Sequence, residues 1–95
     1  MLTGKERASL RAQANRLDTI LHVGKDGITE NTVKQADDAL RARELIKGRV
    51  LESSGITARE ACVRLAEATG SEPVQVIGTR FVLYRANPEL NRITP

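Results

Sequence analysis

The stretch His22–Thr32, HVGKDGITENT, places a glycine on each side of a lysine and an aspartate, between an apolar run and the start of a helix. The run before it, TILHV at 19–23, is short and rich in β-branched residues, so it predicts a buried strand that ends at Gly24. After it, Thr29 is typical of a helix N-cap, because its hydroxyl can accept a backbone N–H of the first turn. The stretch therefore predicts a connection from a strand to a helix.

The connection Gly24–Gly27 has the features of an anion-binding loop. A strand that ends just before a helix N-terminus leaves backbone N–H groups unpaired at the positive end of the helix dipole. Glycines allow close approach, and Lys25 adds a full charge. Without a third glycine or a GK[ST] ending, the loop fits neither the dinucleotide fingerprint nor the nucleotide P-loop. A phosphate of a polymer remains as the expected ligand; the alternative is an ordinary turn in which Asp26 accepts backbone N–H groups.

The remaining elements follow from apolar periodicity, caps and turn residues. Thr3 can cap a first helix, and Thr57 and Gly70 can begin and end a third one. Glycine as the first of the two residues GT between strand-like runs predicts a type II′ hairpin. The expected ranges are 4–16 for the first helix, 29–40 for the second, 45–52 for an alternating strand, 57–70 for the third helix, and 74–77 and 80–85 for the hairpin strands.

The element order α-β-α-β-α-β-β predicts an α/β fold. Helices of crossover length favour parallel pairing, and the final hairpin adds an antiparallel strand to make a mixed four-stranded sheet. The second and third helices are expected to cover one face, and the pattern leaves the place of the first helix open. At 95 residues the chain has room for one domain, expected over 1–86. Residues 87–95 are polar with two prolines and predict a flexible C-terminal tail.

Charge and composition favour a nucleic-acid partner over catalysis. The chain has 15 Lys and Arg against 12 Asp and Glu, and eleven of these cations are arginine, whose planar guanidinium matches phosphates and stacks on bases. Aromatic residues make up only 2% of the chain, so a sheet that stacks bases on aromatic rings is not expected. The spacing of histidine, cysteine and carboxylates predicts no catalytic or metal-binding cluster, so we expect no enzyme, no cofactor and no metal.

We expect the protein to be cytoplasmic. No apolar run reaches the roughly 20 residues that a membrane span requires, and MLTGKERASL at 1–10 lacks the apolar segment of a secretory signal. The single cysteine, Cys62, cannot build a disulfide framework and is expected in the core. His22, which has no partner at ligand spacing, and Tyr84 on a strand face are also interpreted as structural.

Further cations could extend the loop into a binding surface. In the strand 45–52, Lys47 and Arg49 share the face opposite the expected core residues. If several basic side chains converge near the loop they form a groove for phosphates; otherwise they are ordinary solvated charges. The candidates are Arg7, Arg11, Lys47, Arg49, Arg80 and Arg85.

Three separated blocks carry a resemblance to a known family. They are G-x-x-G-[IL]-T-E at 24–30, E-L-[IV]-K at 44–47, and V-Q-V-I-G at 74–78 with L-Y-R at 83–85. In this order they resemble the YhbY family of small bacterial proteins, the stand-alone form of the CRM (chloroplast splicing and ribosome maturation) RNA-binding domain. The resemblance runs from about Leu10 to Arg85, nearly the whole chain.

The resemblance implies a fold like that of the C-terminal domain of bacterial translation initiation factor three. It also implies RNA binding through the GxxG loop and the adjacent basic surface, and association with precursors of the large ribosomal subunit. By position, the implied contact residues are Gly24, Lys25, Asp26 and Gly27, together with Lys47 and Arg85. Gly48 departs from the family's pattern, since related sequences carry a β-branched residue there, and this puts the regularity of its strand in question.

The expected function is therefore binding of ribosomal RNA during assembly of the large subunit. The expected partner is RNA, with no small-molecule substrate and no membrane, and we expect a monomer. The alternatives are a small basic protein-interaction module or a DNA-binding protein, because a basic surface does not by itself distinguish RNA, DNA and acidic proteins.

Overall fold

The elements occur in the predicted order, with one additional 3₁₀ turn. The computed structural model describes residues 2–91 and 93–95, so residues 1 and 92 of the predicted domain and tail lie outside the described residues. Within them the elements are α1 (Gly4–Ala14), β1 (Thr19–Val23), α2 (Glu30–Arg43), β2 (Leu45–Val50), the 3₁₀ turn η1 (Glu52–Ser54), α3 (Ala58–Thr69), β3 (Glu72–Ile77) and β4 (Arg80–Tyr84). The predicted α/β fold is confirmed.

The strands form one mixed sheet in the order β1-β2-β4-β3. β1 and β2 run parallel, because the whole of α2 lies between them and carries the chain back along the sheet. β4 pairs antiparallel with both β2 and β3. The turn between β3 and β4 has two residues, and Gly78 has φ +58°, as the first position of a type II′ turn requires. The predicted four-stranded mixed sheet is therefore present.

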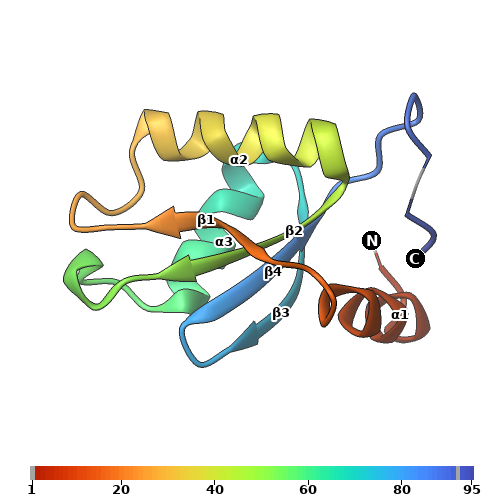
Figure 1. The fold of residues 1–95 in the computed structure, drawn as a ribbon, viewed down its shortest axis with the longest axis horizontal. Helices are drawn as coiled ribbons and strands as arrows, with labels where there is room; N and C mark the ends of the chain where they lie inside the picture. The colour runs from red at the N-terminus through yellow and green to blue at the C-terminus, as the bar shows by residue number, and fades with distance from the viewer. Residues whose placement is uncertain (1, 92) are drawn as a thin grey trace.

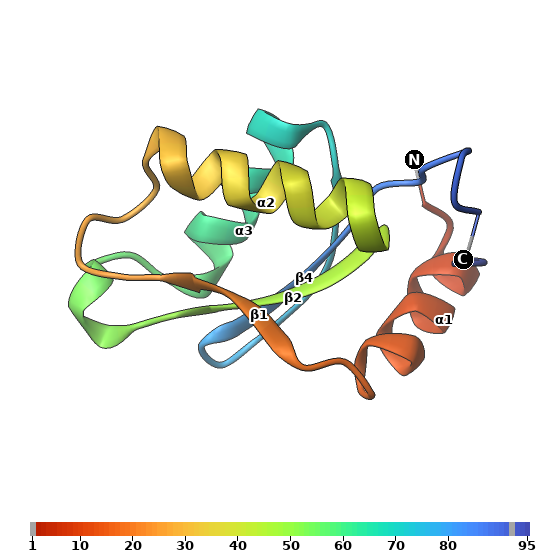
Figure 2. The ribbon, with the colours of Figure 1, turned by 45° about the horizontal axis from the view of Figure 1, so that its top comes forward.

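The two faces of the sheet are covered by different helices (Figures 1 and 2). α2 and α3 lie on one face, where the core includes Leu21, Leu40, Ile46, Cys62, Leu65 and Phe81. α1 lies on the other face, where Leu10 and Ala14 pack with Leu45, Val74, Val82 and Tyr84. The sequence left the place of α1 open. Its short apolar stripe, one helical turn long, packs on the second face of the sheet and so decides the place of the helix.

α1 covers only part of its face of the sheet. Its partners Leu45 and Tyr84 are paired with each other where β2 begins and β4 ends. The connections that follow β1 and β2, and the β3–β4 turn, lie at the other end of the sheet (Figure 1). The open half of this face therefore lies at the same end as the loop Gly24–Gly27.

Gly48 makes room for the ring of Phe81. A Cβ added at Gly48 would lie 2.3 Å from Cζ of Phe81, far inside contact distance. β2 nevertheless pairs residue for residue with β4 from Leu45 to Arg49, while its pairing with β1 shifts register between Thr19 and Leu21, opposite Lys47 and Gly48. The departure from the family's pattern therefore reflects a close packing of glycine under an aromatic ring and leaves the pairing of β2 with β4 intact.

Arg85 ties α2 to the end of α3. Its Nη1 donates to Asp37 Oδ1 and to the carbonyl of Thr69, each at 2.7 Å, and its Nη2 donates to the carbonyl of Asp37 at 3.1 Å. The hydrogen bond from Arg85 holds the pKa of the Asp37 carboxyl below its ordinary range. The structure places Arg85, for which the resemblance implies an RNA contact, at the sheet end opposite to the loop, where its guanidinium is hydrogen-bonded within the protein.

The predicted flexible tail is held against the domain at several points. The backbone N–H of Asn87 donates to Oε2 of the buried Glu44 at 3.1 Å, and its side-chain amide donates to the carbonyl of Arg41 at 2.7 Å. Further on, Ile93 packs against the cluster beneath α1, and Gln13 donates to the carbonyl of Thr94 at 2.8 Å. The described residues of 87–95 therefore contact the domain, whereas the flexibility predicted for this segment stays a prediction. A polar segment can dock through backbone groups that composition does not reveal.

Gly48→Ala should lower the free energy of unfolding by about 1–3 kcal/mol, because the added methyl group overpacks the space occupied by the Phe81 ring. Phe81→Leu alone should also destabilise the protein, by leaving a gap. In the double variant the smaller side chain makes room for the Cβ, so urea denaturation should show a combined loss about 0.5 kcal/mol or more below the sum of the single losses. Strictly additive losses would contradict this packing.

Arg85→Lys should lower the free energy of unfolding by about 1–2 kcal/mol, because a lysine cannot keep the forked contact with Asp37 and Thr69. The pKa of Asp37 is lowered in the folded state. The contribution of its carboxylate to the free energy of unfolding is therefore complete above the unfolded aspartate pKa of about 4, and it is lost as the pH falls through the lower folded pKa. The difference in free energy of unfolding between Arg85→Lys and the parent, measured by denaturation, should therefore become smaller in acid. The control Arg64→Lys makes the same replacement in an exposed pair with Glu60 and should change the stability by about 0.5 kcal/mol or less.

Candidate nucleic-acid interface

The loop between β1 and α2 contains a turn closed on itself. The amide of Gly27 donates to the carbonyl of Gly24 at 2.9 Å. Gly27 has φ +68°, in the left-handed region that favours glycine, and a Cβ there would meet nothing within 4 Å. The alternative of an ordinary turn is thus partly correct, and one amide predicted for anion binding is already used by the protein.

The tip of this turn keeps its donors available. Lys25 and Asp26 are exposed, and across residues 2–91 and 93–95 neither side chain has a hydrogen-bond or ion-pair partner. Their backbone amides likewise donate to no acceptor in these ranges. The alternative in which Asp26 accepts N–H groups of its own turn is therefore not seen among the described residues. A phosphate at the tip would meet two amides and the Lys25 ammonium, with the Asp26 carboxylate as the one unfavourable neighbour.

α2 begins beside the loop with a reciprocal cap. The N–H of Thr32 donates to Thr29 Oγ1, and the N–H of Thr29 donates to Thr32 Oγ1, each at 3.2 Å. The Thr32 hydroxyl also donates to the carbonyl of Gly27 at 3.3 Å, and this hydrogen bond fixes the loop against the helix. The amides of Glu30 and Asn31 are not used by this cap, so the positive end of the helix dipole remains next to the loop. The N-cap predicted at Thr29 is confirmed.

Four exposed residues form a row across the open half of the sheet, which we call the cross-strand row. The register pairs His22 with Arg49, Arg49 with Arg80, and Arg80 with Ile77, one residue from each strand. The core beneath α2 and α3 contains the strand neighbours Leu21, Val23, Val50 and Phe81, and Val76 packs against it, so strand alternation turns the row toward the opposite face. The row lies at the end of the sheet where β1 passes into the loop.

The centre of this row holds two like charges. Arg49 and Arg80 are direct partners on antiparallel strands, an arrangement that destabilises a sheet when both residues carry the same charge. Within the described residues neither guanidinium has an ion-pair partner. The fold gains nothing from this arrangement, whereas a bound phosphate would lie close to both cations.

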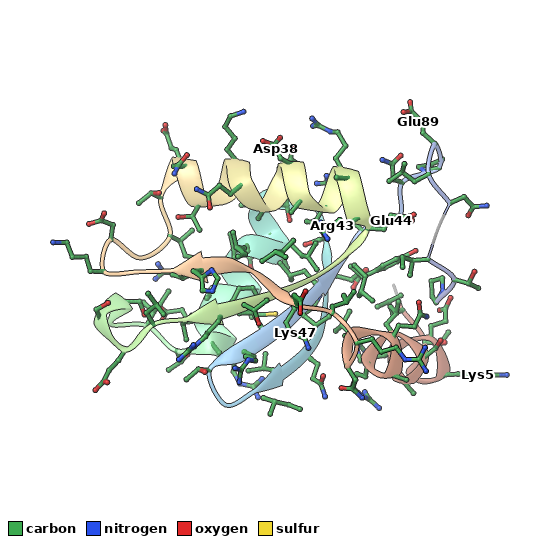
Figure 3. All side chains as sticks on the ribbon, viewed as in Figure 1. Lys5, Asp38, Arg43, Glu44, Lys47 and Glu89 are labelled. Atoms are coloured by element: carbon green, nitrogen blue, oxygen red, sulfur yellow. The ribbon has the colours of Figure 1, made fainter. Side chains whose placement is uncertain are left out.

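Lys47 extends the basic surface from the cross-strand row toward α1. It lines a hollow of about 190 Å³ together with Gln75 and Arg80. On its other side it lines a second hollow of about 220 Å³ together with Arg16 and Arg43. Figure 3 shows Lys47 near the middle of the molecule, between the crossing strands and α1. Basic side chains therefore extend from the cross-strand row to the border of α1, where Asp18 also lines the second hollow.

The structure brings together only some of the predicted cations. Lys47, Arg49 and Arg80 share the open half of the sheet beside the loop. Arg7 and Arg11 lie on α1, at the opposite end of the sheet (Figure 1). Arg7 is half-buried, and its Nη2 donates to a carbonyl of β3 at 3.4 Å. Of the two alternatives left open for Arg7 and Arg11, convergence on the loop is therefore not what the structure shows, because α1 packs against the far end of the sheet.

Sequence reasoning missed three residues of this surface. His22 is exposed at the start of the cross-strand row, and Arg16 and Arg43 border Lys47. Strict alternation in 19–23 could have found His22, since it stands between two residues that face the core. No sequence signal could have found Arg16 and Arg43, because they belong to chain segments that only the folded sheet brings beside Lys47.

The groups that this surface presents to a ligand are charged side chains and backbone amides. The described residues contain no group of three or more histidine, cysteine or carboxylate side chains that could hold a metal ion. Burial raises the pKa of the Cys62 thiol to about 11, so it stays protonated and unreactive at neutral pH. None of the helices in 2–91 combines the length and apolar character needed to cross a membrane.

Comparisons with known proteins identify the family of this chain. Residues 2–85 match the family model for the CRS1 / YhbY (CRM) domain. The chain is 41% identical over 93 residues to a Bacillus subtilis protein named "Probable RNA-binding protein YqeI", covering 98% of this chain and 97% of that one. It is 31% identical over 88 residues to a Haemophilus influenzae protein named "RNA-binding protein", covering 93% and 89% of the two chains.

A solved structure has the same fold. The solution structure of a Staphylococcus aureus protein, described as a candidate RNA-binding protein, superimposes with a TM-score of 0.79 at 45% identity and covers 99% of this chain and 98% of that one. The family match spans almost all of the described domain, including the loop, the cross-strand row and α1. The chain therefore belongs to the CRS1/YhbY (CRM) domain family.

Proposed function

We propose that this protein binds RNA, and that it holds the RNA mainly by its phosphates along the loop tip and the cross-strand row. The observation that carries the proposal is the pair Arg49 and Arg80, two unpaired cations placed directly opposite each other beside a loop with free amides. The names of the B. subtilis and H. influenzae relatives support RNA as the polymer. With one Phe and one Tyr in the chain, contacts to phosphates and RNA shape dominate over stacking on aromatic rings.

The loop and the row form one continuous surface. The N–H of Leu51, just after β2, donates to the carbonyl of Val23, the last residue of β1, at 2.8 Å. This bond fixes the start of the loop beside the end of β2, whose Arg49 is in the row. A polymer could therefore contact Lys25 and the paired arginines at the same time, and binding should depend steeply on salt because several counterions are released.

The finer assignment within this proposal is ribosomal RNA in precursors of the large ribosomal subunit. It is supported by the family to which the chain belongs and by the resemblance of its motifs. We propose that the protein acts there in the cytoplasm as a single copy, as a binding protein and not as an enzyme.

The proposal is tested by titrating the protein with a structured ribosomal RNA fragment and with a DNA duplex of matched length at several salt concentrations. RNA should bind more tightly, with a steep negative slope of log affinity against log salt. Equal affinity for the two polymers would favour the DNA-binding alternative, and a flat salt dependence would contradict phosphate contact.

Lys25→Ala should reduce the magnitude of this slope by roughly 0.7–0.9, which corresponds to one lost phosphate contact. Lys5→Ala is the matched control, because Lys5 is an exposed lysine on α1 at the far end of the molecule (Figure 3). The control should leave the slope unchanged. Equal effects of the two substitutions would show that the loop has no special part in binding.

Arg80→Gln should weaken RNA binding while leaving the stability unchanged or raising it by a few tenths of a kcal/mol, because it removes the repulsion with Arg49. The slope of log affinity against log salt should fall by a little under one. Thermal unfolding and RNA titration of the same preparation separate the two effects. A loss of stability together with normal affinity would assign Arg80 to the fold instead of the interface.

A further inference from the structure

A groove of about 540 Å³ opens beside the loop, between the η1 turn, the start of α3 and the β3–β4 turn. Its walls are largely apolar and include Leu51, Ile56 and Ala58. Its lining residues with polar side chains are Arg49, Glu52, Thr57 and Thr79. The groove is thus chemically unlike the cationic surface that adjoins it.

Leu51 is shared by the groove and the loop. A Cβ added at Gly24 would lie 3.9 Å from Leu51 Cδ1, so the side chain stands directly beside the first glycine of the loop. Leu51 is 36% exposed and, with Val63 and Ile77, is one of three large apolar side chains that the described residues leave exposed. Two of these three, Leu51 and Ile77, border the candidate interface, one at the loop and one at the end of the cross-strand row. Apolar surface is therefore exposed next to the unpaired cations.

The charges of the groove favour a base over a phosphate. Glu52 is exposed, without an ion-pair partner among the described side chains, and its carboxylate would repel a phosphate. The same carboxylate can accept N–H groups from the edge of a base. Apolar walls suit the faces of a base, and Arg49 on the rim suits the phosphate next to it. An apolar peptide would leave both charged groups without a partner.

We propose that this groove receives one unpaired base of the bound RNA, while the neighbouring phosphates contact the loop tip and the cross-strand row. This inference rests on the proposed RNA binding and narrows its ligand to RNA with an unpaired nucleotide, such as a loop, a bulge or a single-stranded end. A base within a duplex can enter the groove only after it is unstacked and unpaired, which is unfavourable. The loop and the row alone would bind uninterrupted duplexes as well as RNA with an unpaired base. The groove adds a preference for the RNA with the unpaired base.

The first experiment needs only the parent protein. It compares a short RNA hairpin with a mixed-sequence loop, the same hairpin in which single loop positions carry abasic residues, and an uninterrupted RNA duplex with the same number of phosphates. Removing one particular base while keeping its phosphate should weaken binding about tenfold, which equals about 1.4 kcal/mol. The duplex should bind with a similar deficit and with the same salt slope, because the phosphate contacts are kept.

The second experiment uses Leu51→Ser, which removes an apolar wall, and Leu51→Met, which keeps it. The serine variant should bind the hairpin about as weakly as the parent binds the abasic hairpin, and the abasic substitution should then have little further effect. The methionine variant should restore most of the affinity. Val63→Ser is the matched control, because Val63 is an exposed apolar residue of α3 outside the groove, and it should leave binding unchanged.

The outcomes separate the inference from the function on which it rests. Equal affinity for hairpin, abasic hairpins and duplex would overturn the base site and leave RNA binding standing. A reduced salt slope in Leu51→Ser, with equal losses for hairpin and duplex, would also overturn it, because the groove would then act on phosphates. Absence of binding to every RNA at low salt would overturn the proposed function, and the inference with it. Failure of the serine variant to fold leaves the abasic series as the deciding measurement.

Discussion

Parallel pairing of β1 with β2 is the constraint on which the arrangement of this molecule depends. Two parallel strands end at the same edge of a sheet, so the chain leaves β1 and β2 side by side. The hydrogen bond from the Leu51 amide to the Val23 carbonyl fixes the two exits against each other. The glycine loop, the cross-strand row and the groove lined by Leu51 all meet at this edge. In a sheet where β1 and β2 ran antiparallel, the loop and Arg49 would lie at opposite ends.

The two ends of the sheet have different physical characters. At the end away from the loop, Arg85 joins α2 to α3, and the buried Glu44 holds the N–H of Asn87. At the loop end, Arg49 opposes Arg80, and Leu51 remains partly exposed. The end away from the loop thus carries the part-buried side-chain contacts of Arg85 and Glu44, whereas the loop end carries a pair of like charges that an anionic polymer could relieve.

The local arrangement of charge matters more than its total. A net charge of +3 is modest, and several cations are neutralised within the protein, as the pairs of Asp37 with Arg41 and Arg85 show. What distinguishes the open half of the sheet is that its basic residues have no acidic partners among the described residues. Phosphate contacts position a nucleic acid, whereas bases carry its identity. The adjoining apolar groove supplies the second kind of contact, which the basic surface alone lacks.

The sequence by itself determined the elements, their order and the class of sheet, because caps at Thr29 and Thr57, the Gly78 turn and apolar periodicity are local signals. It also identified the loop, whose glycines and lysine are contiguous, and placed Lys47 and Arg49 on one strand face by alternation alone. Only the tertiary structure decided which distant cations join them. It placed Arg85, Arg7 and Arg11 away from the loop and brought His22, Arg16 and Arg43 near Lys47 and Arg49, because strand register and the packing of α1 depend on contacts between residues far apart in the chain. Side-chain periodicity is local information, whereas convergence on a surface is a property of the folded chain.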